Sequence, residues 1–163
     1  GGKDYYLFSI EPSTLLKIGF VLHRTRVNDS MAPTYQRLLV PKRLSGITKF
    51  INEGGYFPNS IILNFTEPND DIKVEFDPIH KEQASNAEFG LLRIPNAYGI
   101  AYIIDGQHRV YGYSNSKHKD THTIPVVAFQ NMLSEEQLKI FMDINENQKI
   151  AILQNKMEYH FVE

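Results

Sequence analysis

The chain has 163 residues, of which 42% are hydrophobic and 22% charged, and its net charge is −2. This balance is typical of one folded globular domain, and it excludes a disordered chain and a protein that binds nucleic acid through bulk positive charge. The chain has no cysteine, which excludes a disulfide framework and thiolate chemistry, and no apolar run reaches the ~18 residues of a membrane span, so we expect a cytoplasmic protein without a membrane partner.

The first half of the chain predicts short strands and helices in alternation. Residues 5–10 are apolar and β-favouring, and residues 14–20 follow a proline, so we expect a strand and then a short helix. A longer helix is expected from Pro41 up to a glycine pair, because apolar side chains recur there at helical spacing. Residues 60–65 form a compact apolar run and residues 72–76 alternate, so both predict strands.

The second half predicts a hairpin, two helices and a further strand. Residues 88–94 and 99–104 are apolar runs on either side of a turn that contains proline, which is typical of a β-hairpin. We expect a helix over residues 107–116, a strand over 123–129 that begins at its proline or lies at a sheet edge, and a helix from Ser134. Together these elements predict an α/β fold with a small mixed sheet flanked by helices.

Charge is distributed unevenly along the chain. Residues 20–50 carry six basic side chains against one acidic, whereas residues 66–90 carry seven acidic side chains against two basic. The first segment is a candidate face for an anionic ligand, and the alternative is a solvated helix face beside a solvated acidic loop. The basic side chains that are candidates for contacts with DNA phosphates are Arg24, Arg26, Arg37, Lys42 and Arg43.

The most informative local feature is the segment Ile-Ile-Asp-Gly-Gln-His-Arg at residues 103–109. An apolar strand ends in Asp-Gly where a helix begins, and the first turn of a helix offers unpaired N–H groups to a phosphate. Gly106 allows a ligand to approach the backbone closely. The alternative is a plain turn with Asp105 as the helix cap. We expect residues 100–104 to form a central buried strand and a helix to begin within two residues of Gly106.

All five letters of Asp105–Arg109 match the motif of the DGQHR-domain family, and the chain resembles this family, which includes DndB-type proteins associated with phosphorothioate DNA modification. Three further segments match in order: Tyr35–Arg37 before the helix at Pro41, residues 124–127, and residues 141–149. The resemblance covers roughly residues 33–153, so we expect a single domain over residues 1–163. DndB-type chains are considerably longer, and we therefore expect this domain to be a fragment of a longer protein. More distantly, the motif is similar to that of the ParB/sulfiredoxin superfamily, which implies a small α/β fold.

The resemblance implies a nucleotide site at the motif. In ParB-like relatives the glycine and the basic residues at the helix start hold nucleotide phosphates. Carried over to this chain, the phosphate contacts are Gly106, Gln107, His108 and Arg109, with Arg37 as a second cation that points into the same pocket. The expected ligand is ATP or another nucleoside triphosphate, with Mg²⁺ as its companion.

Several residues have a functional and a structural interpretation that stay open here. Asp105 is a candidate ligand of Mg²⁺ and a candidate catalytic residue, or it caps the helix. His108 is a candidate catalytic or phosphate-contacting residue, or it bonds its neighbours. The candidates for an outer layer of polar contacts are Gln36, Asn145 and Gln148, although asparagine also ends helices.

The leading interpretation is therefore a nucleotide-binding domain of a protein involved in DNA modification or restriction, and whether it hydrolyses the nucleotide stays open. The alternative is a non-enzymatic transcriptional regulator of such a system that binds DNA. A third class is an assembly domain whose C-terminal tail docks elsewhere. A DNA reader should bind with a steep salt dependence, whereas a nucleotide pocket should saturate at one ligand per domain.

Overall fold

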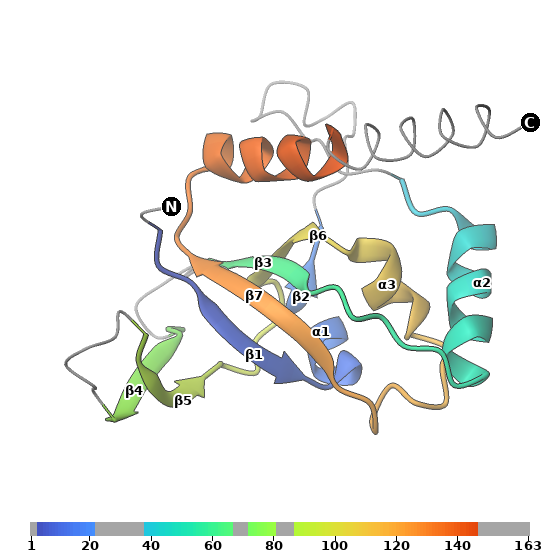
Figure 1. The fold of residues 1–163 in the computed structure, drawn as a ribbon, viewed down its shortest axis with the longest axis horizontal. Helices are drawn as coiled ribbons and strands as arrows, with labels where there is room; N and C mark the ends of the chain where they lie inside the picture. Colours follow the sequence, from blue (N-terminus) through green and yellow to red (C-terminus); the bar gives the residue numbers. More distant parts are fainter. Residues whose placement is uncertain (1–2, 22–37, 67–71, 81–86, 147–163) are drawn as a thin grey trace, which may run out of the picture.

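The computed structural model describes residues 3–21, 38–66, 72–80 and 87–146, which form two sheets and four helices. The labelled elements, shown in Figure 1, are β1 (Tyr6–Ile10), α1 (Pro12–Ile18), β2 (Gly19–Phe20), α2 (Pro41–Asn52), β3 (Ile61–Phe65), β4 (Glu75–His80), β5 (Phe89–Arg93), β6 (Ala101–Asp105), α3 (Gln107–Gly112) and β7 (Ile124–Gln130). The fourth helix spans residues 134–146 and is called the C-terminal helix below. None of the helices in these described ranges is long and apolar enough to cross a membrane.

The predicted α/β class with a mixed sheet is confirmed. The main sheet has the order β1-β7-β3-β6-β2, and β4 pairs with β5 in a separate two-stranded sheet. In the main sheet β7 pairs with β1 antiparallel and with β3 parallel. Strand β6 pairs antiparallel with β3 and parallel with the short β2. The strand expected at residues 100–104 is thus internal, although β3 is the middle strand of the sheet.

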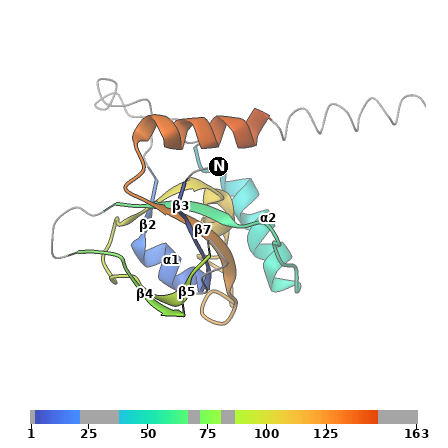
Figure 2. The ribbon, with the colours of Figure 1, turned by 60° about the vertical axis from the view of Figure 1, so that its left-hand side comes forward.

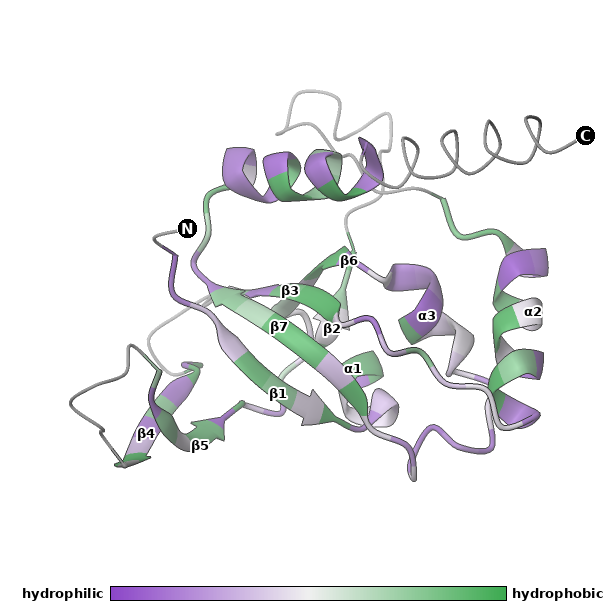
Figure 3. Ribbon diagram, in the orientation of Figure 1, coloured by the Kyte–Doolittle hydropathy of each residue, from purple (hydrophilic) through white to green (hydrophobic). Residues whose placement is uncertain are grey.

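The hydrophobic core lies on one face of the main sheet. Because side chains alternate along a strand, Leu63 and Phe65 point to this face, where Leu15 and Ile18 of α1 are also fully buried. The C-terminal helix lies on the opposite side of the sheet from α1, as Figures 1 and 2 show. The Met132 main-chain N–H donates to Asn64 Oδ1 at 2.9 Å and ties the segment before that helix to the second face. Figure 3 shows the apolar character of β7, β3 and β6 between these layers.

The predicted hairpin of residues 88–94 with 99–104 is wrong. Strand β6 is buried on both faces and lies between β3 and β2, where it needs two neighbours. Strand β5 is largely exposed and pairs with β4, and an Arg93–Asp77 ion pair of 2.6 Å crosses that small sheet. Apolar composition alone did not separate a strand buried on both faces from one half exposed to water.

Several predicted boundaries also need correction. Helix α1 ends at Ile18, before Phe20, because the chain enters β2 at Gly19, where a Cβ would lie 2.6 Å from the Leu15 carbonyl oxygen. Helix α3 ends at Gly112 and does not reach residue 116. The strand expected at 72–76 is displaced to β4. Strand β7 is internal, so the alternative of an edge strand is wrong; its proline is the second residue of the strand and lies one residue before the pairing with β3 begins, which agrees with the alternative of a strand start.

Candidate functional site

The junction between β6 and α3 has the predicted form. Strand β6 ends at Asp105, Gly106 has a φ of +96°, and α3 begins at Gln107. A Cβ at position 106 would lie 2.5 Å from Ile61 Cδ1, so both the backbone conformation and the space require glycine. The N-cap residue of α3 is Gly106, and no side chain caps this helix, so the interpretation of Asp105 as the cap is wrong.

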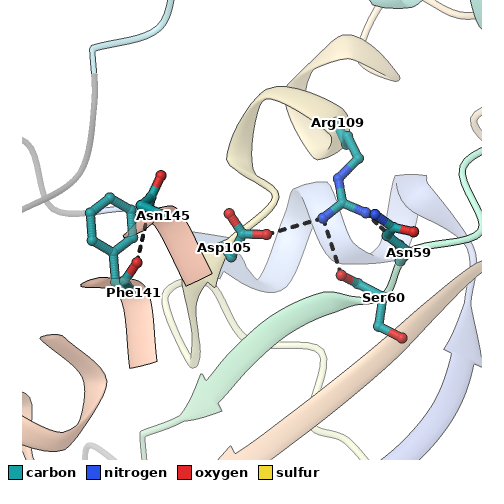
Figure 4. Close-up of polar contacts among 6 residues, drawn as sticks. All are labelled: Asn59, Ser60, Asp105, Arg109, Phe141 and Asn145. Carbon is teal, nitrogen blue, oxygen red and sulfur yellow. Dashed lines mark hydrogen bonds and ion pairs between the residues drawn. The ribbon is translucent and has the colours of Figure 1, made fainter. Parts of the chain in front are cut away.

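Arg109 holds this turn to the segment that enters β3. Its Nη2 donates to Asp105 Oδ2 at 3.2 Å and to the Ser60 carbonyl oxygen at 3.1 Å, and its Nη1 donates to the Asn59 carbonyl oxygen. Figure 4 shows the guanidinium between the Asp105 carboxylate and these two carbonyl groups. The Arg109 side chain is only 17% exposed. Arg109 therefore has a structural role that links α3, β6 and β3.

A second arginine, Arg43, contributes positive charge at this turn. Burial lowers the pKa of Arg109, the Asp105 carboxylate opposes this shift, and the positive charge of Arg43 adds to it. Arg43 belongs to the first turn of α2 and its side chain is exposed. Two arginines that lie 66 positions apart in the sequence therefore act on each other electrostatically, one largely buried and one exposed to solvent. Lys42 is exposed in the same helical turn as Arg43.

His108 joins the start of α2 to α3. Its ring is buried, and its Nε2 accepts a hydrogen bond of 3.4 Å from the Val40 main-chain N–H. An accepting Nε2 requires the neutral tautomer with the proton on Nδ1. This contact supports the structural interpretation of His108 as a residue that bonds its neighbours, while its role toward a ligand stays a prediction. Gln107 is buried next to it.

Asp105 is the residue predicted to hold Mg²⁺. One of its carboxylate oxygens already pairs with Arg109, and no group of three metal-binding side chains exists in the part of the chain that the structure describes. A single carboxylate suits Mg²⁺ only when substrate phosphates and water supply the other ligands. The magnesium site therefore stays a prediction that depends on a bound nucleotide.

The other predicted site residues are distributed as follows. Asn145, near the end of the C-terminal helix, donates from Nδ2 to the Phe141 carbonyl oxygen at 2.6 Å, one helical turn earlier (Figure 4). Its predicted role in an outer polar layer stays a prediction. Five predicted residues lie outside the described residues: Arg24, Arg26, Gln36, Arg37 and Gln148. The pocket that Arg37 is expected to share with Arg109 therefore stays a prediction.

The sequence did not predict two features of the site: its main-chain donors and acceptors, and the effect of Arg43 on Arg109. The carbonyl groups of Asn59 and Ser60 and the N–H of Val40 carry no residue-type signal, because every residue has them. The sequence indicates Arg43 as a contact of DNA, which stays a prediction; it does not indicate that the charge of Arg43 acts on Arg109. The only available signal was that α2 follows the early arginine box.

The fold and site define a class of protein: an α/β domain in which an internal strand passes through a left-handed glycine into a short helix, with cationic side chains from two helices beside the turn. The sequence model of the DndB family, described as DNA-sulfur modification-associated, matches residues 1–152, and the chain belongs to this family. The match includes β1 and α1, which the predicted family core did not. No curated protein and no solved structure matches the chain, and its likeness to ParB and sulfiredoxin proteins stays a prediction.

Proposed function

We propose that the Asp105–Arg109 turn and the first turn of α2 together bind the phosphates of a nucleoside triphosphate, in a protein associated with sulfur modification of DNA. The observation that carries this proposal is the packing of α2 against α3, which brings the positive charge of Arg43 close enough to lower the pKa of Arg109. Asp105 pairs with Arg109, and Lys42 adds a further exposed positive charge to the same helical turn as Arg43. Like charges held together repel one another, and a polyphosphate would relieve that repulsion.

The two arginines have different roles in this proposal. Arg109 is held by Asp105 and by main-chain carbonyl groups, so it fixes the turn and supplies positive potential from a buried position. Arg43 is exposed and has the donor geometry for a bidentate phosphate contact. Ile61 and Arg109 fill the space where a Cβ of residue 106 would lie, so close approach of a ligand to the Gly106 backbone stays a prediction. The contributions of Arg37, Gln107 and His108, and hydrolysis by way of Asp105 and His108, stay predictions.

Calorimetric titration with each of the four nucleoside triphosphates, with and without Mg²⁺, tests the proposal. We expect one ligand per chain. Arg43→Ala should weaken binding by about ten- to a hundredfold, because one charge-assisted hydrogen bond contributes about 1.5–3 kcal/mol. Arg93→Ala is the matched control, because it removes an exposed arginine from β5. Equal losses in the two variants, or no binding to the unaltered chain, would refute the site.

The second candidate function is DNA binding, and one observation favours it. Lys42 and Lys49 are seven positions apart on α2, so they share a face, and both are exposed. A basic row on one helix suits the phosphates of a duplex. Each neutralised phosphate should add about one unit to the slope of log affinity against log salt, and Lys49→Ala should reduce that slope. If the chain has only a nucleotide site, the unaltered chain should not bind DNA with such a salt-dependent affinity.

A further inference from the structure

The outer edge of strand β1 is the least protected edge of the main sheet. In the described residues β1 pairs with β7 alone, so its other side offers unpaired main-chain groups. Proteins usually block such an edge with charges, proline or a very short strand. The opposite edge strand, β2, has only two residues. Residues 6–10 contain neither a charged residue nor a proline, and Leu7 is 71% exposed.

The register of β1 with β7 shows which main-chain groups point outward. Ser9 lies opposite Pro125, which has no N–H, so this antiparallel pair cannot exchange two hydrogen bonds. The hydrogen-bonded pairs must then be the alternate ones, at Tyr6, Phe8 and Ile10. It follows that the N–H and carbonyl groups of Leu7 and Ser9 point away from β7, toward the free edge.

We infer that β1 pairs antiparallel with β1 of a second copy of this chain, with the two Leu7 residues opposite each other. This register makes Leu7 of each copy a hydrogen-bonded pair and places Tyr5 opposite Ser9, which gives about six main-chain hydrogen bonds across the two-fold axis. The two sheets would join into one continuous sheet, and the exposed Leu7 side chains would cover each other on one face.

The charges that flank β1 favour a second copy of this chain as its partner, because they are complementary when two β1 strands pair antiparallel. In this register Lys3 of one copy lies opposite Glu11 of the other, at both ends of the pairing, and Asp4 lies opposite the apolar Ile10. Glu11 is exposed and its backbone is extended, so it continues the line of the strand. Lys3 already contacts Glu136 of its own chain and would lie between two carboxylates. A parallel pairing would instead place lysine beside lysine and glutamate beside glutamate.

Sedimentation equilibrium of the full chain tests this interface. A five-residue pairing buries little area, so we expect a dissociation constant on the order of 100 µM. Leu7→Pro removes an N–H that faces the free edge and should abolish the dimer, while the bonds to β7 remain. Leu7→Lys, which puts like charges on the two-fold axis, gives the same test if the proline variant does not fold. A monomer at about 1 mM, or a dimer that survives both changes, would overturn the inference.

Charge reversal tests the register. Lys3→Glu and Glu11→Lys should each raise the dissociation constant about tenfold, because each homodimer then contains two like-charged pairs. A mixture of the two variants should restore the original affinity, since both pairs in the mixed dimer are again of opposite charge. Lys49→Glu, an equal reversal of an exposed charge on α2, is the matched control and should leave the dissociation constant of the dimer unchanged. No recovery in the mixture, or an equal loss in the control, would reject this pairing; melting curves check that each variant is folded.

Discussion

Replacing Arg109 by alanine separates its structural role from a role in binding. The change removes hydrogen bonds to Asp105, Asn59 and Ser60, and it leaves the Asp105 carboxylate without the cation beside it. Breaking a fully buried ion pair costs about 3–5 kcal/mol. Because the Asp105 side chain is 28% exposed, water can solvate it in part, and we expect a loss of about 2–3 kcal/mol in the free energy of unfolding.

This loss should be visible in both chemical and thermal unfolding. For a domain of this size about 1 kcal/mol corresponds to about 2–4 °C, so the melting temperature of Arg109→Ala should fall by about 4–12 °C. Arg109→Lys keeps a cation near Asp105 but lacks the planar fork that reaches two carbonyl groups, so it should recover only part of the loss. Arg43→Ala, on the exposed first turn of α2, should stay within about 0.5 kcal/mol of the original stability.

Urea unfolding followed by circular dichroism, beside calorimetric titration of the same samples, distinguishes the two roles. If Arg109→Ala keeps its original stability and loses all nucleotide affinity, then Arg109 acts on the ligand and the structural argument is refuted. If both stability and affinity fall, the turn that Arg109 fixes is needed for binding, and Arg109→Lys should recover the two quantities together.

Two further predictions concern a pair of glycines and a pair of histidines. Gly106→Ala should destabilise the fold by about 2 kcal/mol or more, because the φ of Gly106 is positive and the new Cβ would meet Ile61. Gly46→Ala should instead stabilise the fold by about 0.5–1 kcal/mol, because there is open space around Gly46 inside α2. Urea unfolding of both variants measures the difference in stability, and equal effects would contradict the strain argument. Desolvation lowers the pKa of His118, and the charges of the stacked His122 ring and of Lys117 lower it further, so His122→Ala should raise this pKa in an NMR titration. A lowered pKa means that protonation disfavours the folded state, so His118 contributes to stability above its usual pKa and loses that contribution as pH falls. An unchanged pKa of His118 in the variant would show that the charge of His122 has no part in the shift.

Local sequence signals predicted the strand–turn–helix junction well. An apolar run long enough for a buried strand, followed by Asp-Gly and polar residues, determined both the burial of β6 and the start of α3. The same reasoning failed for β5, because a prediction from neighbouring segments assumes that strands close in sequence pair with each other. Strand β6 instead pairs with β3, some forty residues earlier, and no turn residue indicates that choice.

The sequence predicted where in the chain the candidate site lies, but it did not predict which groups contact one another there. The motif indicated Arg109 and Gly106 correctly as members of one turn. It did not indicate that Arg109 uses its guanidinium on main-chain carbonyl groups, since such acceptors leave no trace in residue types. Nor did it indicate Arg43, whose position beside Arg109 depends on how α2 packs against α3. That packing is close because Gly112 has no side chain where it meets Ile47.

The strand order of the main sheet also has a consequence for folding on the ribosome. Strand β1 pairs with β7, and in that register Tyr6 lies opposite Ala128, so β1 meets its partner only after more than a hundred further residues have been synthesised. The middle strand, β3, likewise has one of its two neighbours in β7. Contacts between such distant segments are slow to form, because a long loop must close before they contribute any stability. Until residue 130 has emerged, β1 and β3 therefore expose unpaired edges, and the nascent chain is most vulnerable to aggregation during that interval.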